Sequence, residues 1–295
     1  MSEKILKVLN KHAVFGAALA LCLLGSPAWA GALLGSASQF GVLAGAAVTN
    51  TGSSTVQGDL GLHGSAALGG LSDVVVLGTL HGADNRTKMA SDDALTAFNT
   101  LAGLAFTADL SGQDLGSVGT LLPGIYRFDS LAQLSGTLTL DAQHDPQAMF
   151  IFQIGSDLVT ASGAHIEVLN GVPGQGVYWQ VGNSASLGAG SVFAGNILAG
   201  TGISLDADAK ILCGRALALQ AGVRLNGNVI SNDCESLSGG GHSDFGSAGF
   251  SGSFLPLQLI PEPAALAAFG LLGVALSRRA VRRRRQAPLH HESSR

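Results

Sequence analysis

Residues 185–188 read Ala-Ser-Leu-Gly, residues 203–206 read Ile-Ser-Leu-Asp, and residues 223–226 read Val-Arg-Leu-Asn. The leucines of these look-alike segments recur at spacings of 18 and 20 residues. The surrounding stretch, 121–230, is a succession of short strand-like runs closed by Gly, Asn or Asp turns. Such a spacing is about the length of one coil of a three-sided β-solenoid, with roughly five to six residues per strand plus corners. The pattern therefore predicts an all-β solenoid of about 18–20 residues per coil, with long, flat, repetitive faces.

One long helix is predicted at about residues 86–105. The apolar residues that recur there at helical spacing are Met89, Ala94, Leu95, Phe98, Leu101, Ala102 and Ala105. Asp92 and Asp93 fall on the opposite, polar side. Because an amphipathic helix must bury its apolar stripe, we expect this helix to pack along the side of the solenoid.

Both ends of the chain have the composition of targeting segments. Residues 1–30 combine basic residues, an apolar run at 13–25 and Ala28-Trp29-Ala30, which predicts a secretory signal peptide cleaved after Ala30. The alternative is a membrane anchor, for which the apolar run is short. Residues 236–260 are rich in Gly and Ser and predict a flexible linker.

The last segment begins at Pro261-Glu262-Pro263 and continues through a short apolar run into an arginine cluster, so that 261–285 forms one unit, followed by a basic tail end at 286–295. It resembles a PEP-CTERM sorting signal of Gram-negative bacteria. This resemblance implies export to the outer surface or extracellular matrix, transient membrane contact, and recognition and removal of the tail by an exosortase during export. The expected processing partners during export are therefore signal peptidase and an exosortase. A plain C-terminal membrane anchor is the alternative.

The charge of the predicted exported part excludes one class of partner. From residue 31 to residue 260 there are six basic residues and 17 acidic ones, a net charge near −11. A surface of this sign is a poor match for nucleic acid. We expect no cofactor and no metal site, because the histidines lack metal-ligand spacing.

The two cysteines that remain after the signal peptide, Cys213 and Cys234, lie 21 residues apart, close to one coil. In an exported protein an even number of cysteines favours a disulfide, and we expect these two to pair across adjacent coils. Two free buried thiols are the alternative.

The body of the chain, about 38–232, resembles the microbial ice-binding (antifreeze) protein family. The resemblance is carried by stretches that follow one another in the family's order: 40–45, 48–52, 58–61, 108–116, 122–126, 136–142, 150–155, 179–182 and 195–199. It implies a right-handed, discontinuous solenoid domain, placed at 31–235, whose first coil comes from the N-terminal segment. A capping region and the long helix are then expected before the remaining coils.

Ice binding requires a flat, rigid face with regularly spaced small polar or methyl-bearing groups, for which threonine is well suited because its β-branch restricts χ1. With the leucines directed inward, the candidate surface residues are Thr49, Thr51, Thr160, Ser162, Ser186, Ser204, Asp206, Asp208, Arg224 and Asn226. For the coil that contains Leu158, the alternation does not decide whether Thr160 and Ser162 point outward like the other candidates. Asp206, Asp208 and Arg224 are charged, which disfavours strong ice activity on this face.

Three functions remain open from the sequence. The first is an exported, non-enzymatic protein that adsorbs to ice or a similar repetitive surface. The second is a structural or adhesive matrix protein that holds an extracellular polymer on the same scaffold. The third is a polysaccharide-active enzyme, whose candidate residues would be Asp206, Asp208, Lys210, Arg215 and Arg224. Local ion pairs on a solvated surface are the alternative explanation for that group.

Overall fold

The structure is a computed structural model that describes residues 33–64, 68–145, 148–171 and 176–232. The chain divides into two units, 1–255 and 256–295. The predicted signal peptide, the linker and the Pro261-Glu262-Pro263 segment lie outside the described residues, as does Cys234.

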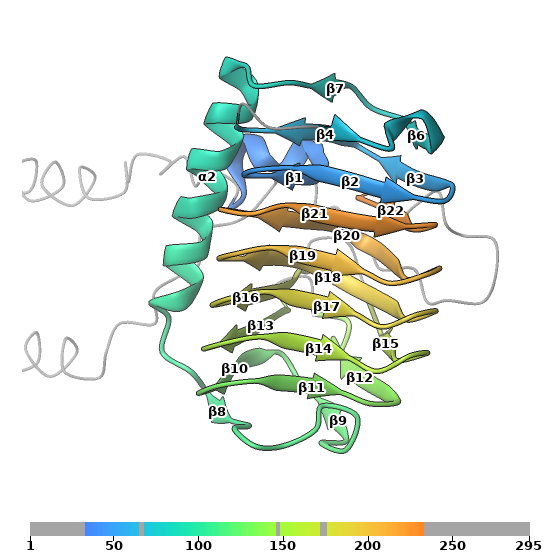
Figure 1. Ribbon diagram of the computed structural model, residues 1–295. Helices are drawn as coiled ribbons and strands as arrows, with labels where there is room; N and C mark the ends of the chain where they lie inside the picture. The colour runs from blue at the N-terminus through green and yellow to red at the C-terminus, as the bar shows by residue number, and fades with distance from the viewer. Residues whose placement is uncertain (1–32, 65–67, 146–147, 172–175, 233–295) are drawn as a thin grey trace, which may run out of the picture. The chain divides into compact units, whose positions relative to one another are not determined.

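The described residues form two parallel β-sheets and one α-helix (Figure 1). The seven-stranded sheet has the order β11 (Ala132–Leu134), β14 (Leu158–Thr160), β17 (Ala185–Leu187), β19 (Ile203–Leu205), β21 (Val223–Asn226), β2 (Val48–Thr51) and β5 (Leu68–Gly69). The 15-stranded sheet contains β1 (Phe40–Ala44), β3 (Ser54–Gln57), β4 (Asp59–Leu62), β6 (Val74–Val76), β7 (Leu80–His81), β8 (Ala108–Asp109), β9 (Thr120–Leu121), β10 (Gly124–Phe128), β12 (Thr137–Asp141), β13 (Met149–Ile154), β15 (His165–Leu169), β16 (Gly176–Val181), β18 (Val192–Ala199), β20 (Lys210–Ala218) and β22 (Val229–Ser231).

The three look-alike segments lie on adjacent strands. Ser186 of β17 pairs with Ser204 of β19, which pairs in turn with Arg224 of β21. The spacing is wider in the preceding strands, where Gln133 pairs with Val159 and Val159 with Ser186, 26 and 27 residues apart. Coil length therefore varies along the stack. The right-handed winding stays a prediction.

The order of strands in space differs from their order in the chain. β2 pairs with β21 on one side and with β5 on the other, while β1 pairs with both β20 and β4. The N-terminal strands therefore lie against the last strands of the stack (Figure 1). This arrangement is the discontinuity that the family resemblance implied.

An aromatic stack runs through the core across consecutive strands. The Trp179 ring lies 3.9 Å from the Phe152 ring at an interplanar angle of 7°, and 4.8 Å from Phe193. Tyr126 stacks on the other side of Phe152 at 5.4 Å. The indole Nε1 of Trp179 donates to the carbonyl of Ala194 at 3.0 Å. Buried aromatic rings contribute large apolar areas, so this stack holds the strands at a fixed separation.

The helix α2 (Asn85–Ala102) covers one side of the 15-stranded sheet, as Figure 1 shows. It begins in a capping box, in which the Asp84 carboxylate accepts from the Thr87 backbone N–H at 2.8 Å and the Thr87 hydroxyl accepts from the Asp84 N–H. It ends three residues before the predicted boundary, with Gly103 as the C-cap residue. Short 3-10 helices occur at η1 (Gly35–Gln39) and η2 (Leu71–Asp73).

The buried stripe of α2 differs from the predicted one. Ala94 and Leu101 are buried as expected, but Ala90 and Ala97 complete the buried stripe. Met89 and Leu95 are 60% and 48% exposed, and Ala102 and Ala105 are also exposed, so the prediction was wrong for these four. Alanines face the sheet because small side chains allow the helix backbone to approach Ile151, Tyr178, Leu198 and Leu217 closely. Among the described residues, no helix has the length and apolar character needed to cross a membrane.

Candidate functional site

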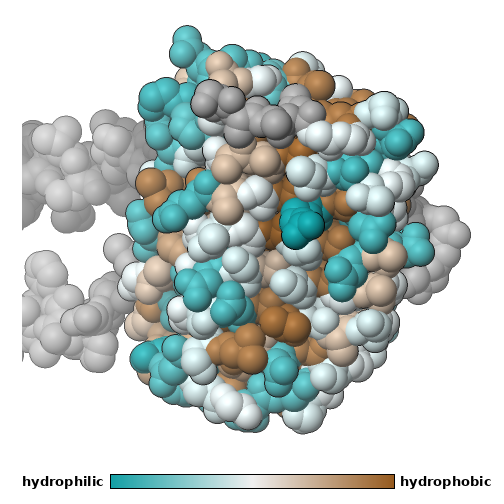
Figure 2. Space-filling view, viewed as in Figure 1, coloured by the Kyte–Doolittle hydropathy of each residue, from teal (hydrophilic) through white to brown (hydrophobic). Residues whose placement is uncertain are grey.

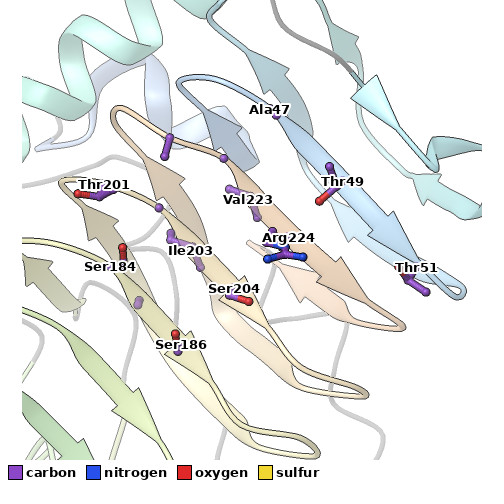
Figure 3. Close-up of a pocket in the computed structure, with 14 residues that line it drawn as sticks. Ala47, Thr49, Thr51, Ser184, Ser186, Thr201, Ile203, Ser204, Val223 and Arg224 are labelled. Carbon is purple, nitrogen blue, oxygen red and sulfur yellow. The ribbon is translucent and has the colours of Figure 1, made fainter.

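The outward side of the seven-stranded sheet, here called the seven-strand face, carries one row of side chains in register. Its members are Gln133, Val159, Ser186, Ser204, Arg224, Thr49 and Gly69, one from each strand from β11 to β5. Neighbouring strands of a sheet are spaced about 4.8 Å apart, so the row repeats at about that distance. Figure 3 shows Ser186, Ser204, Arg224 and Thr49 aligned across their four strands.

A second row, formed by Asp157, Ser184, Gly202, Gly222 and Ala47, precedes the first by two residues. Backbone hydrogen bonds continue the ladder through it, for example from the Ile203 N–H to the Gly222 carbonyl at 3.0 Å and from the Val223 N–H to the Ala47 carbonyl at 2.9 Å. A Cβ at Gly222 would lie 2.6 Å from that Ala47 carbonyl oxygen, so glycine is required for the close approach. The small side chains leave a broad, shallow hollow (Figure 3).

The seven-strand face is held in register from behind. The residues that alternate with the outward row, including Val48, Ala185, Ile203 and Val223, are buried at 2% exposure or less. Because each outward side chain has buried neighbours before and after it, the face cannot shift by one residue without exposing the core. The result is a rigid surface of small groups.

In the first row of this face, the charged residue is Arg224. Figure 2 shows a mostly pale surface over β17 with one strongly hydrophilic spot over β19 and β21, and an apolar patch over β11 and β14. The exposed Arg224 guanidinium has no ion-pair partner among the described residues. The apolar patch corresponds to Leu131 and Val159.

Asp157, just before β14, connects β14 to the start of β17 through its side chain. Its carboxylate accepts from the Ser156 hydroxyl at 2.8 Å and from the Ser184 backbone N–H of the next strand at 3.0 Å. These hydrogen bonds, that from Ser156 first, lower the pKa of Asp157 below its usual value. The carboxylate is therefore bound locally and serves to join two strands.

The structure brings most of the predicted surface residues together. Six of them lie at the seven-strand face: Thr49, Thr51, Ser186, Ser204, Arg224 and Asn226. Thr51 pairs with Asn226 in the next outward position. Asp206 and Asp208 are exposed just after β19, with Asp208 in a left-handed turn at φ 59°.

Thr160 does not reach the surface. It is 4% exposed, and its hydroxyl accepts from the Gly188 backbone N–H at 2.9 Å. Val159 is the outward residue of β14, and Ser162 lies exposed in the turn that follows this strand. Thr160 is therefore removed from the set of candidate surface residues. The alternation of inward Leu158 and outward Val159 could have shown that the Thr160 side chain points inward.

The sequence did not single out Gln133, Val159, Ala47, Gly202 and Gly222, all of which lie on the face. The two glycines and the alanine have no polar side-chain group that would mark them as candidate binding residues in the sequence. Their positions, two residues before each outward Ser, Arg or Thr, were the available signal.

The five residues proposed for an enzymatic site do not assemble. Arg224 is on the seven-strand face, and Lys210 begins β20 in the other sheet. Arg215 is buried at 1% exposure, where its guanidinium donates to Ser38 and Asn196. A grouping of Asp206, Asp208, Lys210, Arg215 and Arg224 at one site was therefore wrong.

The part of the chain that the structure describes holds no cluster of three or more His, Cys, Asp or Glu suited to a metal ion. His81 lies 3.2 Å from both Asp59 and Asp84, so it links β4 and β7 to the start of α2. Cys213 on β20 is buried and disulfide-bonded. Its predicted partner, Cys234, is outside the described residues.

Comparison with known proteins gives consistent matches over this same region. The family described as Ice-binding-like matches residues 42–231. An ice-binding protein of Nostoc sp. (strain HG1) is 45% identical over 232 residues, which cover 78% of this chain and 86% of that protein.

Solved structures of ice-binding proteins also match this region of the chain. The crystal structure of an ice-binding protein from the Antarctic ascomycete Antarctomyces psychrotrophicus superposes with a TM-score of 0.65 at 35% identity, covering 69% of this chain and 98% of the other. An ice-binding protein from an Antarctic Biological Consortium gives a TM-score of 0.63 at 38% identity, covering 67% of this chain and 89% of the other.

Proposed function

This chain belongs to the ice-binding-like family, and from that premise we propose that it is a non-enzymatic protein that adsorbs to ice through the seven-strand face. The observation that carries the proposal is the outward row in which Ser186, Ser204, Arg224 and Thr49 lie in register. Adsorption through such a face changes the growth of a crystal without any covalent step.

The spacing of the face suits an ordered water layer. Groups repeat at about 4.8 Å across the strands and at roughly 6.7 Å along each strand, which defines a two-dimensional array. The hydroxyls of Ser186, Ser204 and Thr49 each both donate and accept a hydrogen bond. Gly202, Gly222 and Ala47, in the second row, leave room for water close to the backbone. These features support adsorption to a lattice rather than to a single small molecule.

The test is to obstruct the array with a bulky side chain. We expect the wild-type protein to show thermal hysteresis and to inhibit ice recrystallisation. The double variant Ser186→Tyr/Ser204→Tyr is expected to lose both effects, because two adjacent rings lift the surface off a flat crystal plane. Thr137→Tyr is the matched control, since Thr137 is exposed on β12 of the other sheet.

Two results would contradict the proposal. A wild-type protein without any effect on ice at high micromolar concentration would remove ice as the target. Equal loss of activity in Thr137→Tyr and in the double variant would exclude the seven-strand face as the adsorbing surface.

The proposal includes export. Removal of residues 1–30 by signal peptidase and of the 261–285 segment by an exosortase would release the protein at the outer surface or into the extracellular matrix. The sequence features that support this are Ala28-Trp29-Ala30 and Pro261-Glu262-Pro263. Mass spectrometry of the protein recovered from cells and from medium would identify both new termini, and an intact C-terminus in all fractions would contradict tail removal.

The proposal also includes a disulfide between Cys213 and Cys234. The disulfide-bonded state of Cys213 supports it, and so does the composition of the chain, because the third cysteine, Cys22, falls within the predicted signal peptide. Peptide mapping without reduction is expected to recover the two cysteines in one cross-linked peptide. Recovery of both as free thiols would overturn this part.

A further inference from the structure

A second hollow, separate from the seven-strand face, lies where α2 ends. It has a volume of about 450 Å³, within the range of small-molecule sites. Its walls come from the segment after the helix, including Leu104 and Phe106, and from the ends of β10, β13 and β16. Arg127, Gln153 and Gln180 pair in register across these three strands, so they present one polar row to the hollow.

Gln153 is fixed by the helix. Its Nε2 donates to the carbonyls of Leu101 and Leu104 at 2.7 and 2.8 Å, which satisfies the C-terminal end of α2. Both protons of the amide nitrogen are used in this way, and Oε1 remains as an acceptor. Gln153 therefore contributes acceptor capacity at a fixed position.

Gln180, the next residue in the row, is 7% exposed and lines the same hollow. Its side chain makes no hydrogen bond with any of the described residues. Although the residue as a whole is buried, the Gln180 amide is not among the enclosed groups that lack a partner, so its oxygen and nitrogen are open to the hollow. The amide therefore offers an acceptor and donors to a ligand that can use both.

The mouth of the hollow carries two opposite charges and an aromatic ring. Arg127 forms an ion pair with Asp129, and its guanidinium lies 5.1 Å from the centre of the Phe106 ring. Phe106 is 44% exposed, which leaves apolar surface available for contact. The ion pair retains further donors on Arg127 and further acceptors on Asp129.

From this geometry we propose that the hollow binds one glycosyl unit of a neutral polysaccharide. A hydroxyl both donates and accepts, so adjacent hydroxyls of a sugar match the acceptors of Gln153, Gln180 and Asp129 and the donors of Gln180 and Arg127. The apolar C–H surface of the sugar ring would contact Phe106. An anionic ligand is disfavoured by Asp129 and by the carbonyl end of α2.

The test uses three uncharged trisaccharides, cellotriose, mannotriose and galactotriose, each titrated into the purified protein and followed by ligand-observed NMR. We expect at least one to bind with a Kd on the order of 1 mM. Gln180→Leu is expected to raise that Kd about tenfold, in line with the loss of a hydrogen-bonded pair. The permethylated form of the same trisaccharide, which lacks hydroxyl donors, is expected not to bind.

Arg127→Leu provides a second variant at an exposed position, which protects the test against misfolding of Gln180→Leu. It is also expected to weaken binding. Arg224→Leu, on the seven-strand face, removes an equal charge far from the row and is expected to leave the Kd unchanged. The proposal is overturned if no trisaccharide binds, or if a trisaccharide binds Arg127→Leu and Gln180→Leu as tightly as the wild type. Neither outcome bears on ice adsorption, which is measured separately.

Discussion

The guanidinium of Arg215 donates to the carbonyl oxygen of Ser38 through both Nε, at 2.9 Å, and Nη2, at 2.7 Å. The two residues are 177 positions apart in the chain. Nη1 donates to the Asn196 side chain at 2.8 Å. Burial lowers the pKa of Arg215 to about 10, so the side chain remains charged at neutral pH. One buried cation thus joins the N-terminal segment to β18 and β20.

Replacing Arg215 by Met is expected to lower the free energy of unfolding by about 3 kcal/mol, because the Ser38 carbonyl and the Asn196 amide oxygen lose their donor while remaining buried. Urea denaturation followed by circular dichroism measures the change. The matched control is Arg224→Met, an exposed arginine, for which we expect a change within about 0.5 kcal/mol. Similar effects for the two variants would contradict the role assigned to Arg215.

Replacing Trp179 by Ala is expected to cost about 4 kcal/mol, because it opens a cavity beside Phe152 and Phe193. Trp179→Phe keeps most of the ring volume but leaves the Ala194 carbonyl without the indole donor, and is expected to cost about 1–2 kcal/mol. Thermal unfolding should rank the proteins in that order. A destabilisation of Trp179→Phe as large as that of Trp179→Ala would show that the hydrogen bond, rather than packing, dominates.

Replacing Thr160 by Val tests its removal from the candidate surface. The substitution keeps the shape but leaves the Gly188 N–H without its acceptor, so we expect a loss of about 1–2 kcal/mol of stability. Recrystallisation inhibition per folded molecule is expected to be unchanged, since the side chain faces inward. Ser162→Ala, in the exposed turn, is expected to change neither quantity. A selective loss of ice activity in Thr160→Val would place Thr160 back on the surface.

Replacing Arg224 by Thr is expected to increase thermal hysteresis. Arg224 is a long, strongly hydrated cation in a row whose neighbours, Ser204 and Thr49, are short. Threonine would extend the run of small hydroxyl groups and is conformationally restricted by its β-branch. Arg224→Lys keeps the charge and is expected to resemble the wild type. Reduced hysteresis in Arg224→Thr would indicate that the guanidinium itself contacts the crystal.

Acid is expected to lower the stability that the Asp157 carboxylate contributes to the folded protein. The pKa of this carboxyl is lowered in the folded state by hydrogen bonds from Ser156 and Ser184, so its stabilisation is present above the unfolded pKa of about 3.9. That stabilisation is lost as pH falls through the lower folded pKa, since the unfolded state then binds the proton more readily. Urea unfolding measured below about pH 4 should show a shallower pH dependence for Asp157→Asn than for the wild type. Equal slopes would contradict the assignment.

Much of the fold could be predicted from the sequence, because inward leucines and turn glycines recur along it. Leu187 and Leu205 pair directly, as their matching segments indicate. The buried side of α2 was harder to predict. Hydropathy favours Met89 and Leu95 over Ala90 and Ala97, whereas the close contact with the sheet favours the smaller side chains. Packing distance is a tertiary property that a helical pattern does not contain.

The candidate site was predictable where a polar outward residue alternates with buried neighbours, as at Ser186, Ser204 and Arg224. Thr160 was assigned ambiguously, although the alternation of inward Leu158 and outward Val159 indicates an inward side chain; what the sequence does not show is that its hydroxyl accepts from a backbone N–H 28 residues away. The hollow at Gln153 and Gln180 was also missed. Both residues lie in runs of buried apolar residues, and only the register of β13 with β16 reveals that they form a row.

The position of β2 between β21 and β5 has a consequence for biosynthesis. The first strands to emerge from the ribosome have their neighbours, β20 and β21, more than 160 residues later in the chain, as the pairing of Val42 with Ala216 shows. Contacts of such long sequence separation form slowly. The N-terminal strands therefore cannot complete their pairing until translation has passed β21. A chain that must cross a membrane before folding would benefit from this delay, because closure of the stack waits for its last coils.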